Sequence, residues 1–217
     1  MKIAVLFRGP VRPNPSRVVD RVKEFMGHFA NITPDIQVTT YLATWRTWKQ
    51  YNAAELLALD MFDNVIMQTP PTSEHWSRCT AITKLPNGAD IEPVFKMYYQ
   101  SKTALDLIVN ADNYDFIVHT RTDLQMILGN HINDWFDINY FIAPHVHPNP
   151  FMNDQFGIAP GHLMHKAWDY GNMNNFKRLI ESSDKPEAIL QTMIDEAGIK
   201  VRTAQYIAWN LDPMRNH

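Results

Sequence analysis

Residues 114–123 read YDFIVHTRTD and form the most informative stretch of this 217-residue chain. The apolar, β-favouring run 116–118 predicts a buried strand, and Arg121 and Asp123 follow where that strand leaves its sheet. In open α/β sheets, ligands bind just beyond the carboxyl ends of the strands. A cation and a carboxylate two residues apart at such an end predict a site for an anionic ligand and its metal ion.

The rest of the chain alternates between strand and helix patterns. Apolar runs predict further strands at residues 3–7, 36–42, 64–67 and 139–143, and an edge strand at 199–201. Helical spacing of apolar residues predicts helices at 18–29, 45–59, 94–111, 161–171, 174–182 and 186–197. Two segments predict loops, at residues 68–93, with four prolines, and at 145–154. We therefore expect one α/β domain, residues 1–217, with a Rossmann-like, mainly parallel sheet flanked by helices.

Bulk composition narrows the function classes. The net charge of −3 argues against a general nucleic-acid-binding surface. The single cysteine excludes an intrachain disulfide framework and favours a reducing compartment. No apolar run approaches the roughly 18 residues of a membrane span, and the first one is shorter than a signal-peptide core. We expect a cytoplasmic protein without a transmembrane segment.

A short basic segment, FRGPVR at residues 7–12, follows the first predicted strand. Gly9 permits close approach of the backbone to a ligand. Arg8 and Arg12 can fork around phosphate oxygens or stack on a base. The alternative is a solvated turn that carries two surface arginines.

Two carboxylates are candidates for chemistry. Asp123 suits a hard cation that bridges two phosphates, because Mg²⁺ and Mn²⁺ take oxygen ligands. The alternative is that Arg121 and Asp123 pair with each other or cap the next turn. Asp154 is a candidate general base, or a group that holds a sugar hydroxyl, and its alternative role is to cap a short helix.

Histidine and lysine provide weaker candidates. His145, His147, His162 and His165 lie close in sequence, but the absence of a nearby cysteine and of HExxH spacing argues against zinc. One of them, with His165 as the candidate, can complete a mixed carboxylate–imidazole metal site. Lys102 can reach the site from its predicted helix, although a helical lysine is usually solvated.

Four motifs, taken in order, resemble the small GT-A-type glycosyltransferases. They are R-G-x-x-R at residues 8–12, Y-x-x-T-W at 41–45, Y-D-x-I-x-x-T-R-x-D-L at 114–124 and D-Q-F at 154–156. The resemblance spans roughly residues 2–157. It includes the WavE-like proteins of bacterial polysaccharide synthesis and a glycosyltransferase domain of large algal (chlorella) viruses.

The resemblance implies a nucleotide-sugar donor, usually a UDP-sugar, a glycan or glycoprotein acceptor, and Mn²⁺ or Mg²⁺. The D-x-D metal motif of the family matches residues 121–123, where Asp123 is the second aspartate and Arg121 replaces the first. Arg8, Gly9 and Arg12 match the first loop, which holds the nucleotide, and Asp154 matches the region of the acceptor-contacting or base carboxylate. The expected donor site consists of Phe7, Arg8, Gly9, Arg12, Lys102, Arg121 and Thr122.

The expected activity is metal-assisted transfer of a sugar to an acceptor hydroxyl. One alternative is a sugar-phosphate nucleotidyltransferase, which typically has a longer glycine-rich first loop with a lysine. The other is a non-catalytic carbohydrate-binding module, favoured by six tryptophans and eight tyrosines. The two alternatives differ from the transferase in what they bind: sugar phosphates in one case, glycans without nucleotide in the other.

Overall fold

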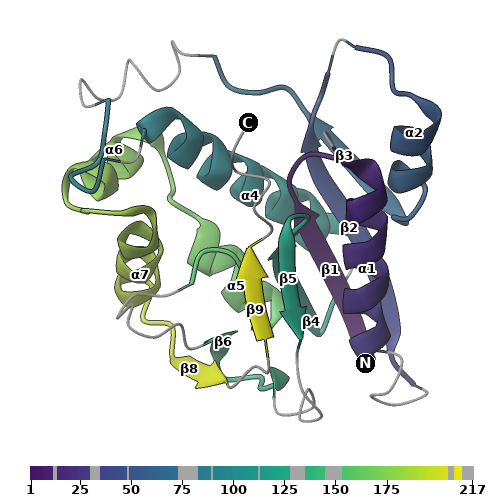
Figure 1. Cartoon of the computed structure of the whole chain (residues 1–217). Coiled ribbons are helices and arrows are strands. Elements are labelled where there is room, and N and C mark those ends of the chain that lie inside the picture. Colours follow the sequence, from purple (N-terminus) through teal and green to yellow (C-terminus); the bar gives the residue numbers. More distant parts are fainter. Residues whose placement is uncertain are drawn as a thin grey trace.

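The structure is a computed structural model of the chain, and it describes residues 1–11, 14–29, 35–47, 49–72, 83–88, 90–111, 113–127, 135–144, 153–204 and 208–211. One mixed sheet organises the fold, with helices on both faces (Figure 1). Its strands are β1 (Lys2–Arg8), β2 (Gln37–Trp45), β3 (Asn64–Gln68), β4 (Phe116–Arg121), β6 (Phe141–Pro144), β7 (Gly157–Ala159) and β8 (Val201–Ala204). The helices are α1 (Pro15–Phe29), α2 (Ala53–Leu59), α4 (Ile91–Ala111), α5 (Gly161–Trp168), α6 (Met173–Glu181) and α7 (Pro186–Glu196).

The strand order is β3-β2-β1-β4-β7-β6-β8. The first four strands in this order run parallel, as the alternating pattern predicts. β7 is antiparallel to both β4 and β6, and β8 lies parallel to β6 at the edge. The carboxyl ends of β1, β2 and β4 therefore lie together at one edge of the sheet, where ligands bind in this architecture.

The side chains of β1 point alternately into two apolar cores. Ala4 and Leu6 pack with α4, α5, α6 and α7 on one face, and Ile3, Val5 and Phe7 pack with α1 and α2 on the other. All five side chains are almost fully buried. This burial explains why β1 reads as a continuous apolar run, since both faces of the strand are covered.

The predicted helix at 45–59 is wrong in its first half. β2 continues to Trp45, and α2 begins only at Ala53. Asn52 caps the helix, because its side chain accepts from the N–H of Glu55 while the Glu55 carboxylate accepts from the N–H of Asn52. β2 ends in Thr44 and Trp45, which are residue types that favour strands. The spacing of the apolar residues in this segment does not distinguish a strand from a helix, and this explains the wrong prediction.

A two-stranded ribbon lies in front of the main sheet in Figure 1, and the sequence patterns do not predict it. β5 (Leu124–Ile127) pairs antiparallel with β9 (Ala208–Leu211). β5 begins directly after Asp123. Its pairing with β9 therefore connects the end of β4 to a strand near the C-terminus of the chain. Among the described residues, no helix combines the length and apolar character needed to cross a membrane.

Candidate functional site

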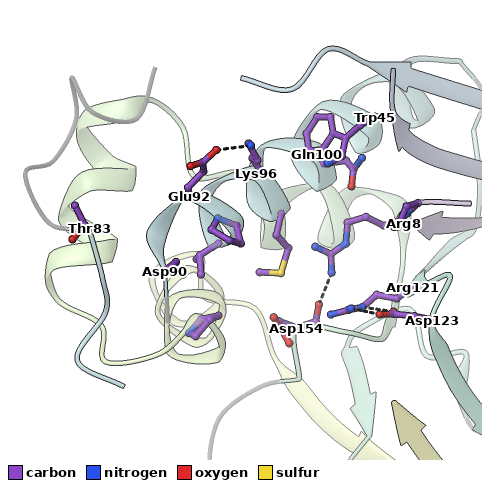
Figure 2. A pocket seen from close by; sticks show the side chains of 16 residues that line it. Arg8, Trp45, Thr83, Asp90, Glu92, Lys96, Gln100, Arg121, Asp123 and Asp154 are labelled. Carbon is purple, nitrogen blue, oxygen red and sulfur yellow. Dashed lines mark hydrogen bonds and ion pairs between the residues drawn. The ribbon is translucent and has the colours of Figure 1, made fainter. Parts of the chain in front are cut away.

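A cavity of about 860 Å³ opens at the carboxyl ends of β1, β2 and β4 (Figure 2). It is bounded by the strand ends, the start of α4 and the segment before β7. Its lining residues are Arg8, Gly9, Pro10, Trp45, Thr83, Asp90, Glu92, Pro93, Val94, Lys96, Met97, Gln100, Arg121, Asp123, Asp154 and Pro186. Five of the predicted site residues are therefore brought together here, namely Arg8, Gly9, Arg121, Asp123 and Asp154.

The ends of β1 and β4 are fastened to each other by a tight contact. The Thr122 N–H donates to the Arg8 carbonyl at 3.1 Å, and the Thr122 hydroxyl donates to the Pro10 carbonyl at 3.2 Å. Gly9 has a φ of 140°, and a Cβ there would lie 2.4 Å from the Thr122 hydroxyl oxygen. Only glycine fits this position without displacing Thr122, and the contact fixes where both arginines leave their strands.

Arg8 lies at the floor of the cavity and is 5% exposed. Its Nη2 donates to the Asp154 backbone carbonyl at a long 3.4 Å, and its guanidinium lies 5.8 Å from the ring centre of Trp168. Within the described part of the chain, the Nε–H of Arg8 has no hydrogen-bond partner. Burial, followed by repulsion from Arg121, lowers the pKa of Arg8 to about 10, so the side chain stays charged at neutral pH.

Arg121 and Asp123 form a two-pronged ion pair on the cavity wall (Figure 2). Nε of Arg121 donates to Oδ1 of Asp123 at 2.7 Å, and Nη2 donates to Oδ2. Both side chains are mostly buried, at 16% and 21% exposure. The sequence leaves open whether these residues pair with each other or line a site, and the structure shows both.

Asp154 is 6% exposed and faces the cavity from the segment before β7. The alternative role as a helix cap is wrong, because the residues that follow form a bend and then β7. The Asp154 carboxylate lies near enough to Arg8 to raise its pKa, which partly offsets the effect of burial. A carboxylate thus shares the cavity with two guanidiniums.

The opposite wall of the cavity comes from one face of α4. Lys96 and Gln100 lie one turn apart on this helix, and the Lys96 ammonium donates to the Glu92 carboxylate at 2.6 Å (Figure 2). Gln100 is buried, and its Nε2 has no hydrogen-bond partner among the described residues. The sequence predicts Lys102 as the residue of this helix that reaches the ligand. In the structure, Lys96 and Gln100 line the cavity instead, because residues four apart share one face of a helix.

Lys102 and His165 belong to a second polar cluster and do not line the cavity described above. Lys102 bridges Asp106 and Asp169, each at 3.1 Å, and His165 contacts Asp106 at 2.6 Å. Burial alone would lower the pKa of Lys102, but its hydrogen bonds to the two aspartates outweigh burial and raise that pKa. This cluster joins α4 to α5 and the turn that follows α5.

Of the remaining predicted residues, Phe7 and Thr122 are packed inside the protein, and the others lie outside the residues that the structure describes. Phe7 is 2% exposed and packs edge-on against Phe25 and Phe62 in the core. Thr122 is buried in the contact with Gly9 and Pro10. Arg12, and also His145 and His147, lie outside the described residues.

A buried layer of polar and aromatic groups supports Arg8 from behind. The His119 ring packs on Trp168 with ring centres 4.4 Å apart, and His119 Nε2 lies 3.1 Å from the Ser101 hydroxyl. Burial, and then the charges of Arg8 and Arg121, hold the pKa of His119 well below its usual value. His119 is therefore neutral at neutral pH and adds no third positive charge beside the two arginines.

The residues at this site do not fit the divalent cation that the resemblance implies. Both Asp123 oxygens already accept from Arg121, and the first position of the motif is a cation. His165 bonds Asp106 in the second cluster. Throughout the described ranges, no three His, Cys, Asp or Glu side chains are grouped so that they could hold a metal ion.

The fold has a solved counterpart. The structure is similar to that of a mutant of Drosophila β-1,4-galactosyltransferase 7 in complex with manganese, UDP-Gal and xylobiose, with a TM-score of 0.51 and 11% sequence identity. The match covers 97% of this chain and 70% of that protein. No family model and no curated protein sequence matches the chain. The similarity shows a GT-A-like fold, and the narrower resemblance to the algal virus domain and the WavE-like group stays a prediction.

Proposed function

We propose that this chain is a glycosyltransferase that moves a sugar from a nucleoside-diphosphate sugar, most simply a UDP-sugar, to a hydroxyl group of a glycan acceptor. The observation that carries the proposal is the cavity at the carboxyl ends of β1, β2 and β4, where two arginines and a buried carboxylate face the same space. The GT-A-like fold supports it, because ligands of open α/β sheets bind at this edge.

The arginines suit the diphosphate of the donor. In the transfer, the bond from the anomeric carbon to the β-phosphate oxygen breaks, and negative charge develops on the departing nucleoside diphosphate. Guanidiniums that already point to that position stabilise the charge as it forms, without further reorganisation. Arg8 is held in place by the Asp154 carbonyl and Trp168, and Arg121 by Asp123.

Two other residues suit the remaining parts of the reaction. The acceptor oxygen forms the new bond to the anomeric carbon, and its proton passes to a base, for which Asp154 is the candidate. Trp45 lines the cavity at the end of β2 and offers a face on which the nucleobase can stack.

Calorimetric titration with UDP, GDP, dTDP and CMP tests the proposal. We expect one nucleoside diphosphate, UDP first, to bind in the micromolar to millimolar range, and the corresponding nucleotide sugar to release it when an acceptor glycan is added. Absence of binding by all four nucleotides would contradict the transferase. A nucleotidyltransferase would instead release pyrophosphate from a nucleoside triphosphate and a sugar phosphate, and a carbohydrate-binding module would bind glycans alone.

A further inference from the structure

We propose that this site holds the diphosphate of its donor with the guanidiniums of Arg8 and Arg121 and works without a divalent cation. The inference rests on the proposed function, since it concerns how the same donor is bound. It departs from the metal dependence that the resemblance implies, and it follows from the side chains at the exit of β1 and β4.

Asp123 is already engaged by Arg121. Its two oxygens accept from Nε and Nη2 of one guanidinium, which is the strongest geometry of a carboxylate with an arginine. A cation would have to break this pair in a mostly buried position. Breaking it would leave the Arg121 guanidinium without its partner next to a second arginine, which is unfavourable.

Two guanidiniums meet at the carboxyl ends of β1 and β4. Arg8 and Arg121 are aligned across the parallel pairing of these strands, so that two positive groups lie close together. Their mutual repulsion contributes to the lowered pKa of Arg8. Asp123 and Asp154 offset this positive charge, so what the pair offers a ligand is a set of directed N–H donors, and a group with several negative oxygens, such as a diphosphate, matches those donors.

Both arginines have N–H donors that the described residues do not use. Nε of the buried Arg8 has no partner within the described chain, and its bond to the Asp154 carbonyl is long. Arg121 uses Nε and Nη2 on Asp123, which leaves Nη1 available on the same planar group. The two guanidiniums thus carry more donors than the described residues use, and an anionic ligand would accept from those that face the cavity.

The decisive experiment measures UDP binding to the full chain by calorimetry in Mn²⁺ and again in EDTA. We expect the two dissociation constants to agree within about twofold, and the Mn²⁺ electron paramagnetic resonance spectrum in the mixture to match that of Mn²⁺ with UDP alone. Binding that weakens tenfold or more in EDTA overturns the inference and leaves the glycosyltransferase intact. Absence of nucleotide binding in both buffers overturns the proposed function and this inference together.

Arginine variants test which groups hold the phosphates. We expect Arg8→Lys to weaken UDP binding by about 10- to 100-fold, because the planar fork is lost while the charge is kept. Binding of uridine should not change. Arg178→Lys is the control for the general effect of an arginine-to-lysine change, because Arg178 pairs with Glu196 and does not line the cavity. Equal losses for UDP and uridine would show that Arg8 only supports the fold of the site.

Asp123→Asn separates the two roles open to that carboxylate. If Asp123 orients Arg121, the variant weakens UDP binding by the same factor in Mn²⁺ and in EDTA, by about 3- to 10-fold for a lost orienting bond. A loss confined to the Mn²⁺ samples would identify Asp123 as a metal ligand and overturn the inference. Urea unfolding of each variant confirms that the fold is retained.

Discussion

Arg8 and Arg121 occupy paired positions at the ends of two neighbouring parallel strands, β1 and β4. Because the backbones are aligned there, the two guanidiniums enter one cavity side by side, each secured by a different group. A single sheet edge thus supplies two guanidiniums for the phosphates of a nucleoside diphosphate, and the neighbouring residues can be tested one at a time.

Asp154 is the candidate base, and Asp154→Asn is its test. We expect UDP affinity to stay within about twofold and the transfer rate to fall by about 10²–10⁴-fold, because the acceptor proton has no recipient. Asp90→Asn is the control, since Asp90 lines the same cavity but is 63% exposed and pairs with Lys84 at 3.5 Å. A normal rate in Asp154→Asn, measured by release of UDP from the nucleotide sugar, would remove this residue from catalysis.

Gly9 should tolerate no side chain. Gly9→Ala places a Cβ against the Thr122 hydroxyl at a positive φ, so we expect a loss of about 1–3 kcal/mol in the free energy of unfolding. Urea denaturation measures this loss. Gly27→Ala is the control, because Gly27 lies within α1 and no atom lies within 4 Å of the position that an added Cβ would take. That change should be neutral or slightly stabilising.

The double variant Gly9→Ala with Thr122→Ala separates crowding from backbone strain. It should recover part of the lost stability, because the hydroxyl that the new methyl group meets is removed. The strain at positive φ stays in the double variant. Thr122→Ala alone measures the cost of losing the bond to Pro10, and a double variant as unstable as the two single losses added together would show that the contact with Thr122 contributes nothing.

His119 predicts an acid-sensitive stability. The pKa of His119 in the folded protein lies well below the usual value near 6.5, so the unfolded chain binds the extra proton first. Stability should therefore fall as the pH drops below about 6.5, by up to about 1.4 kcal/mol per pH unit from this one group. His119→Phe keeps a ring against Trp168 and should flatten the profile between pH 6.5 and 4.5. If the free energies of unfolding of the wild type and of His119→Phe, measured by urea denaturation, changed in parallel with pH, this prediction would be contradicted.

Asp169 predicts a loss at more acidic pH. Burial would raise its pKa, but the Gly171 N–H and Lys102 outweigh burial and lower it. The ionised Asp169 therefore stabilises the folded protein above about pH 4, which is near the pKa of an aspartate in the unfolded chain. This stabilisation is lost as the pH falls further. The difference in urea midpoint between the wild type and Asp169→Asn should be clear at pH 7 and close at pH 3. A difference that grows on acidification would refute this pairing.

Residues 114–123 predict β4 and the position of Arg121 and Asp123, because a fully buried strand that ends in charged residues leaves a strong local pattern. β7 has three residues and pairs through contacts distant in sequence, so no local pattern reveals it or the antiparallel pairing that it introduces. Lys102, which the sequence analysis expects in the donor site, does not line the cavity, and helix geometry explains why. Lys102 lies two residues beyond Gln100, roughly 200° further around α4, and so it points away from the cavity wall.

The β5–β9 ribbon also affects the order in which the protein can fold during synthesis. β5 follows Asp123 closely, yet its partner strand β9 is made about 80 residues later. At the usual 5–20 residues per second, β5 leaves the ribosome with an unpaired edge for roughly 4–16 s. The backbone beside Asp123 is therefore among the last parts to reach its final pairing, because the strand that follows Asp123 stays unpaired until β9 is made.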